Sequence, residues 1–177
     1  MFDPLVPLGG AESLWRRLDA CVERNGRAPD VLISLFWHAR SAQAIHDRYA
    51  GARVWAHEPA RHLVAERTAW TNVFRVGDPL PGGVEAIDAR RAFEVLYWLP
   101  DQRTLIAGDV LHGTRCGRIQ LLLDSWLGTA DRAAFYAGLR SMLDLPIERI
   151  IPAHGEPVLT NGREALSRAI AERELQP

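Results

Sequence analysis

The sequence of 177 residues has few of the features that mark a specialised class of protein. It has two cysteines, Cys21 and Cys116, far apart and outside any Cys-x-x-Cys motif, which argues against a disulfide framework or a thiolate zinc site. Its formal net charge of −1 gives no indication of nucleic acid or an anionic membrane as a partner. No apolar run approaches the about 20 residues needed to span a bilayer, and residues 1–7 lack the basic region of a signal peptide. We therefore expect a cytoplasmic protein that binds neither nucleic acid nor membranes.

What is present is the composition of an ordinary globular protein, with 47% hydrophobic and 24% charged residues. Hydrophobic periodicity and turn residues predict helices and strands in alternation at both ends and a run of short strands between them. The chain contains no repeat, linker or low-complexity tract, so we predict a single α/β domain over residues 1–177 with helices outside packed sheets. The predicted helices are 11–25, 42–51, 61–68, 130–145 and 160–174, the predicted strands are 29–33, 53–57, 72–76, 84–88, 93–99, 104–107 and 147–151, and residues 119–127 stay ambiguous.

The most informative stretch is residues 34–41, where a buried strand is followed by a helix. Strand-to-helix junctions are where α/β folds concentrate their chemistry, because strand ends and helix starts converge on one cleft. This junction carries Trp37, His38 and Arg40. The plain alternative is a packed aromatic side chain with a histidine and an arginine at a helix start.

Three segments together resemble the metallo-β-lactamase superfamily. Residues 150–158, Ile-Ile-Pro-Ala-His-Gly-Glu-Pro-Val, resemble its late histidine-bearing turn. Residues 104–111, Thr-Leu-Ile-Ala-Gly-Asp-Val-Leu, resemble its hairpin strand ending in Gly-Asp, whose aspartate bridges two metals. Residues 78–84 and 96–100 resemble the strand meander that precedes this hairpin strand. The resemblance implies a metallo-β-lactamase-like αββα sandwich.

The same resemblance implies that strands are missing at the N-terminus. Phe2-Asp3-Pro4 resembles the end of an early strand that normally follows two or more others. A sheet edge left unpaired tends to pair with another chain, so we expect a homodimer or a marginally stable chain.

The resemblance also implies a dinuclear site built on a His-x-His-x-Asp-His motif, and here the sequence departs from the pattern. The four ligand positions fall on Leu35, Trp37, Ala39 and Arg40, none of which binds zinc. A further histidine position falls on Arg90, or on Arg91 within alignment error. We predict that the dinuclear site is lost.

Of the implied ligands, Asp109 and His154 remain. Losing one outer partner of a metal site typically costs about 10–100-fold in affinity, so losing most direct ligands should abolish tight binding. We therefore predict no resident cofactor or, if any, a single zinc ion at Asp109 and His154, with His38 or His112 as a third ligand.

The sequence leaves three functions open. The first is a pseudoenzyme whose former cleft binds a small anionic ligand, with Arg40 and Arg90 paired to Asp109 in place of the metals. The second is a hydrolase of the thioester or lactone type with one metal, so whether the protein is an enzyme stays open. The third is a structural module whose cleft is filled by its own side chains, Trp37 among them. The candidate cleft residues are Trp37, His38, Arg40, Arg90, Asp109, His112 and His154.

Overall fold

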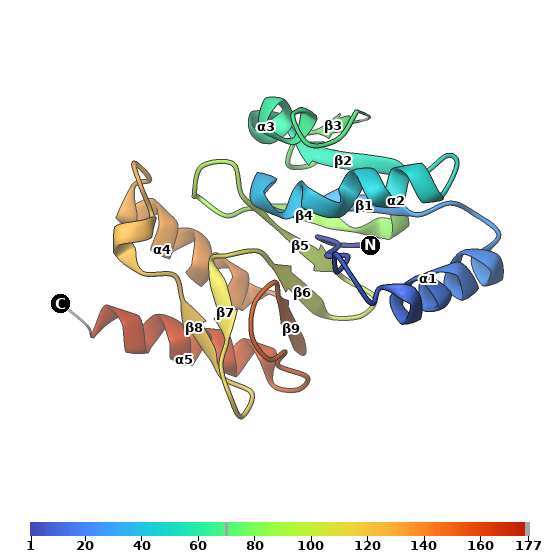
Figure 1. Ribbon diagram of the computed structural model, residues 1–177. Coiled ribbons are helices and arrows are strands. Elements are labelled where there is room, and N and C mark those ends of the chain that lie inside the picture. The colour runs from blue at the N-terminus through green and yellow to red at the C-terminus, as the bar shows by residue number, and fades with distance from the viewer. Residues whose placement is uncertain (70, 176–177) are drawn as a thin grey trace. The chain divides into compact units, whose positions relative to one another are not determined.

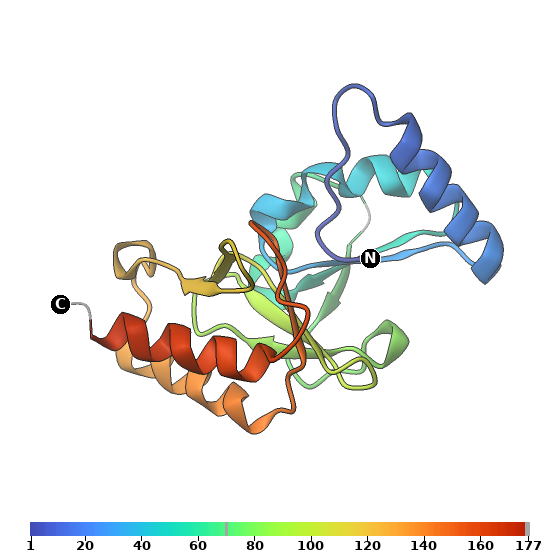
Figure 2. The ribbon, with the colours of Figure 1, turned by 90° about the horizontal axis from the view of Figure 1, so that it is seen from below.

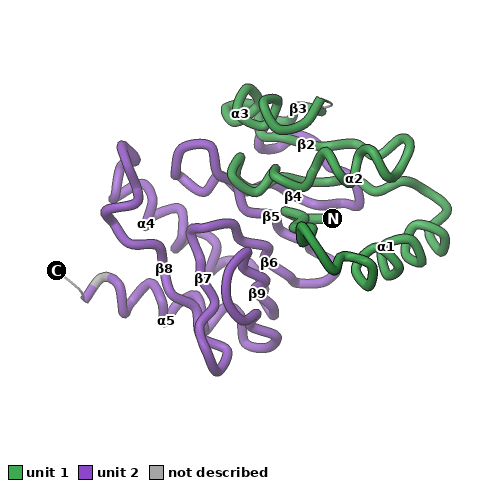
Figure 3. The backbone as a smooth tube through the Cα atoms, viewed as in Figure 1, with its two compact units in different colours: residues 1–74 green, residues 75–177 purple. Residues whose placement is uncertain are grey.

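The computed structural model describes residues 1–69 and 71–175. These form two units, residues 1–74 and residues 75–177 (Figure 3), called here the N-terminal and the C-terminal unit. Each unit is described by itself, and a single domain over residues 1–177 stays a prediction. Among the described residues, no helix is both long and apolar enough to cross a bilayer.

The N-terminal unit is built on a parallel sheet in the order β1-β2-β3 (Figure 1). Parallel neighbours need a crossover between them, and short helices supply it here. The first residues of the chain run beside β1, because Phe2 forms a parallel bridge with Leu32 and the Asp3 amide donates to the Leu32 carbonyl at 3.1 Å. The elements are α1 (Glu12–Asn25), β1 (Asp30–Ile33), α2 (Ala42–Arg48), β2 (Arg53–His57), α3 (Arg61–Ala65) and β3 (Asn72–Phe74).

The C-terminal unit has a four-stranded sheet in the order β4-β5-β6-β9 and a separate pair, β7-β8. The first three strands are antiparallel, and β9 joins β6 in parallel. The helices predicted over 130–145 and 160–174 are confirmed as α4 and α5. The elements are β4 (Glu85–Asp88), β5 (Val95–Leu99), β6 (Thr104–Ala107), β7 (Leu111–Gly113), β8 (Ile119–Leu121), α4 (Arg132–Ser141), β9 (Arg149–Pro152) and α5 (Gly162–Glu174).

Short 3-10 helices connect several of these elements. The ambiguous stretch 119–127 resolves into β8 followed by one of them. They are Phe36–Ser41, Glu58–Ala60, Pro81–Gly83, Asp124–Trp126 and Met142–Asp144.

The core of the C-terminal unit lies between its sheet and two helices. Side chains alternate along a strand, so Leu96 and Trp98 of β5 point to one face and Tyr97 to the other. Leu96 and Trp98 belong to the same buried cluster as Phe135 of α4 and Leu166 of α5. The two helices lie side by side (Figure 2). This packing fixes the strand ends from which the candidate site residues project.

Candidate metal site

Asp109 lies in the turn after β6, and a buried glutamate fixes the backbone of that turn. The amides of Asp109 and Val110 both donate to Glu94 Oε1, at 2.6 Å and 2.9 Å. The other carboxylate oxygen of Glu94 accepts from the Arg91 guanidinium. Glu94 is 1% exposed and the Arg91 side chain 15%. Burial raises the pKa of Glu94, while the charge of Arg91 and the Val110 amide act in the opposite direction.

The Arg91–Glu94 ion pair lies in a turn of unusual backbone conformation. Arg90 and Phe93 have positive φ angles of 55° and 64°, a region that non-glycine residues seldom adopt. Such residues cost on the order of 1–3 kcal/mol each and persist only when surrounding contacts hold them in place. The Arg91–Glu94 pair lies within this turn and links it to the Asp109 turn.

His154 follows β9, and its backbone is fixed against β7 by two glycines. The Gly113 amide donates to the His154 carbonyl at 2.9 Å. A Cβ at Gly113 would overlap the carbonyl of Glu156, and a Cβ at Gly155 would overlap the carbonyl of Gly113. Gly155 also has a φ of +85°. Both positions therefore require glycine, which explains the His-Gly dipeptide in the sequence.

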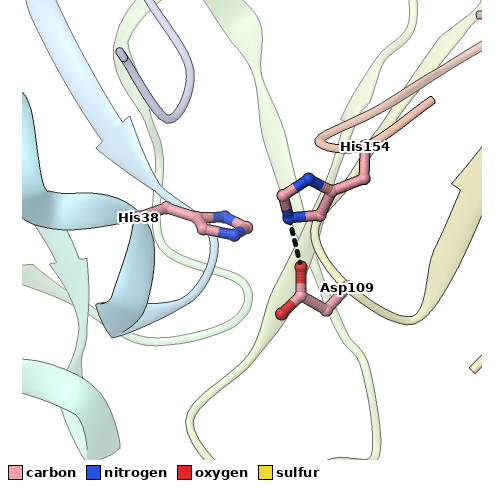
Figure 4. Close-up of side chains that lie close together, drawn as sticks. All are labelled: His38, Asp109 and His154. Atoms are coloured by element: carbon pink, nitrogen blue, oxygen red, sulfur yellow. Dashed lines mark ion pairs between the residues drawn. The ribbon is translucent and has the colours of Figure 1, made fainter. Parts of the chain in front are cut away.

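Asp109 and His154 point toward each other, as Figure 4 shows, with 3.3 Å between Asp109 Oδ1 and His154 Nε2. The Asp109 side chain is 18% exposed and that of His154 53%. The His112 ring lies edge-to-face against His154, with 5.9 Å between ring centroids. Burial lowers the pKa of His112, which favours the neutral imidazole. The C-terminal unit thus holds a carboxylate and two imidazoles close together, the donor types that zinc prefers.

His38, also drawn in Figure 4, belongs to the N-terminal unit and is held there by Asp3. Its Nδ1 lies 3.1 Å from Asp3 Oδ2, and the same carboxylate accepts from the Ser34 amide at 2.8 Å and from the Ser34 hydroxyl. An ionised carboxylate only accepts, so the hydrogen lies on His38 Nδ1, and in the neutral imidazole Nε2 then carries the lone pair. A carboxylate in this position is the usual outer partner of a metal-binding histidine.

The remaining predicted residues of the N-terminal unit are not ligands. Leu35 and Ala39 are buried apolar side chains, 2% and 0% exposed. Trp37 is 55% exposed, and the Arg67 guanidinium lies 5.4 Å from the centre of its ring. Arg40 is exposed, and its pairing with Asp109 stays a prediction.

The expectation that Arg90 pairs with Asp109 is corrected by the structure. Arg90 is 57% exposed and its guanidinium lies 3.5 Å from Asp88. Its stem packs over Gly138, where a Cβ would lie 2.9 Å from Arg90 Cγ. The cation that stabilises the Asp109 turn is Arg91, the next residue. It pairs with Glu94, which accepts hydrogen bonds from the amides of that turn. The sequence signal that could have revealed this is an acidic residue directly before the apolar strand β5.

Neither a protein-family model nor a curated protein matches the sequence. Solved structures do match. A metallo-β-lactamase from Pontibacter korlensis is 18% identical, with a TM-score of 0.62 over 91% of this chain and 77% of that chain. A metallo-β-lactamase family protein from Thermus thermophilus, TTHA1429, is 15% identical, with a TM-score of 0.64 over 98% and 70%. TTHA1623 in a di-iron-bound form is 23% identical, with a TM-score of 0.62 over 93% and 85%.

These neighbours show that the chain has the metallo-β-lactamase fold, so the fold and the mixed α/β class predicted from the sequence are confirmed. At such low identities the likeness concerns the fold alone. The prediction that N-terminal strands are missing stays a prediction, as does the homodimer.

Proposed function

We propose that this metallo-β-lactamase-fold protein holds one divalent metal ion, through Asp109 and His154, and uses it to hydrolyse a small thioester or lactone. The observation that carries the proposal is the 3.3 Å between Asp109 Oδ1 and His154 Nε2. Two atoms bound to one tetrahedral zinc ion at about 2.0–2.1 Å lie about 3.3–3.4 Å apart. The pair therefore fits a single ion without rearrangement.

The residues at the former ligand positions argue against a second ion. Leu35 and Ala39 are buried and apolar, and Trp37 offers no ligand atom for zinc. Arg40 is a cation, which disfavours a metal ion nearby. These positions support a site with one metal.

The charges of the C-terminal unit favour a cation over the small anion that the sequence suggested. Glu94 is balanced by Arg91, and Arg90 is paired with Asp88. Asp109 adds a further carboxylate, beside which an anionic ligand is repelled and a divalent cation attracted. The anion-binding hypothesis is therefore the less well supported of the two.

The third protein ligand stays a prediction, with His112 and His38 as the candidates. His112 lies against His154, and His38 has its Nε2 lone pair fixed by Asp3. A bound zinc ion supplies a water of lowered pKa and polarises a carbonyl. The chain's own contribution is to hold Asp109 in place through Glu94, and His154 through the Gly113–Gly155 contact.

A competition titration of zinc against a chelating dye tests this proposal. We expect Asp109→Asn and His154→Ala each to lose more than the about 10–100-fold typical of an outer partner, because both remove direct ligands. His38→Ala and His112→Ala identify the third ligand. His62→Ala, which changes an exposed histidine, serves as the control and should leave the affinity unchanged. Zinc affinity unaffected in Asp109→Asn and His154→Ala would contradict the proposal, as would zinc-dependent thioesterase activity that survives in both.

A further inference from the structure

The C-terminal unit contains a cavity of about 340 Å³ beside α5. It lies between β8, the segment that follows β8, and the last turns of α5. This volume is at the lower end of the about 300–1,000 Å³ typical of small-molecule sites. Its apolar walls are formed by Ile119, Leu121, Leu122, Leu123, Trp126 and Ala169.

Six of the ten lining residues are apolar, the polar ones include His112 and Gln120, and the two charged ones are balanced. Glu172 pairs with Arg118 at 2.6 Å, and Arg173 with Asp124 at 3.4 Å. An apolar ligand in the cavity would therefore not cover a charged side chain that lacks a counterion. A straight aliphatic chain suits such walls better than a charged or strongly polar group.

Two large apolar side chains of this cavity are left in solvent. Leu123 is 54% exposed and Trp126 59%. Exposed apolar surface next to a concave site is typical of a ligand-binding groove, because a bound ligand removes that surface from water. The occupant should therefore cover Leu123 and Trp126 as well as fill the cavity.

One residue connects the cavity to the candidate metal site. His112 lines the cavity, and its ring lies 5.9 Å from that of His154, which in turn pairs with Asp109. A molecule that fills the cavity contacts His112. A reacting group placed against His112 would lie near His154, and so near the Asp109–His154 pair.

We propose that this cavity binds the aliphatic acyl chain of the substrate, about six to ten carbons long, with the thioester or lactone carbonyl at the His112 end. The position of the carbonyl rests on the proposed function. Binding of the chain itself depends on the apolar walls and needs no metal. The cavity thus sets the substrate class as medium-chain acyl compounds.

Calorimetric titration of the metal-free protein with octanoate, hexanoate and acetate tests the proposal. The three probes carry the same carboxylate, so any repulsion from Asp109 is common to them and the differences in affinity report the chain alone. We expect octanoate to bind about tenfold more tightly than hexanoate, since each buried methylene contributes about 0.8 kcal/mol, and acetate to show no binding. Equal affinity for octanoate and acetate would overturn the proposal.

Paired variants place the binding in this cavity. Ala169→Phe fills it from α5 and should abolish octanoate binding, whereas Ala171→Phe changes an exposed position of the same helix and should not. Leu123→Ala should weaken binding about tenfold, and Leu159→Ala, which changes a similarly exposed leucine outside the cavity, should leave it unchanged. If Ala169→Phe fails to fold, the leucine pair still decides. Octanoate binding that is unaffected in both cavity variants would overturn the proposal.

The same titration separates this proposal from the proposed function. Octanoate binding by a wild-type protein that holds no zinc after saturation would support the cavity and contradict the metal proposal alone. Zinc binding without octanoate binding would do the reverse.

Discussion

The two units each use a largely buried carboxylate to hold the residues that follow a strand, but they compensate its charge differently. In the N-terminal unit, Asp3 accepts from the Ser34 amide and hydroxyl and from His38, just after β1. In the C-terminal unit, Glu94 accepts from the amides after β6 and pairs with Arg91. Arginine stays charged at every accessible pH, so the C-terminal arrangement is compensated throughout. The N-terminal one relies on hydrogen bonds to a serine and an imidazole.

The comparison shows how each unit fixes the backbone beside its candidate ligand residues. The Asp109 turn is held by an ion pair and two amide bonds, so it keeps its shape without a metal. At the N-terminal junction, Leu35 and Ala39 are buried apolar side chains, and their packing helps to hold the backbone there.

Breaking the ion pair of the C-terminal unit should have the largest effect on stability. Arg91→Ala leaves Glu94 buried without its cation, and removing one partner of such a pair typically costs about 3–5 kcal/mol. We expect a fall of that size in the free energy of unfolding, measured by urea titration. Arg90→Ala is the matched control, because its side chain is 57% exposed and its pair with Asp88 should contribute about 1 kcal/mol or less. Equal losses in the two variants would show that the Arg91–Glu94 pair does not stabilise the turn.

Removing the carboxylate of Asp3 in the N-terminal unit should lower the free energy of unfolding by less. Asp3→Ala removes the acceptor of the buried Ser34 amide, and an unsatisfied buried donor costs about 1–3 kcal/mol. Unlike Arg91→Ala, this change does not leave a buried carboxylate without its cation, so the loss should be smaller. Asp47→Ala, which removes an exposed acceptor of the Gln43 side chain, should change the free energy of unfolding by no more than about 0.5 kcal/mol. A loss in Asp3→Ala larger than in Arg91→Ala would reverse the comparison.

The smallest effect concerns Asp30, a carboxylate at the start of β1. Burial raises its pKa, but hydrogen bonds from Arg53 and Trp55 outweigh this and hold the pKa below its ordinary value of 3.8. The resulting stability is present above that value and is lost as the pH falls through the lower pKa of the folded state. Because Arg53 is 53% exposed, we expect a contribution of about 1 kcal/mol or less.

Unfolding of the wild type and Asp30→Asn at a series of pH values checks this prediction. The difference in stability between them should shrink as the pH is lowered below about 4. A difference that stays constant from neutral to acidic pH would contradict the lowered pKa.

The sequence predicts the fold because its informative segments are local. In the His154-Gly155 turn, for example, Gly155 has a φ of +85°, a local backbone conformation that favours glycine. The helices near the C-terminus follow from their apolar periodicity. Such features need no knowledge of the tertiary structure.

What the sequence could not give depends on contacts between distant segments. Glu94 acts on amides fifteen and sixteen residues away, so neither its role nor that of its partner Arg91 could be predicted from the sequence. The cavity lies between β8 and α5. Because the structure of residues 119–127 stayed ambiguous in the sequence, this side of the cavity could not be predicted. Charge pairs and cavities of this kind appear only when the chain is folded.

The central claim is a site for one metal ion at Asp109 and His154, and counting the metal tests it most directly. The protein is saturated with zinc, dialysed without chelator, and measured by elemental analysis alongside the Asp109→Asn/His154→Ala double variant. The account predicts close to one zinc ion per chain in the wild type and none in the double variant. Two zinc ions per chain, or one that the double variant retains, would contradict it.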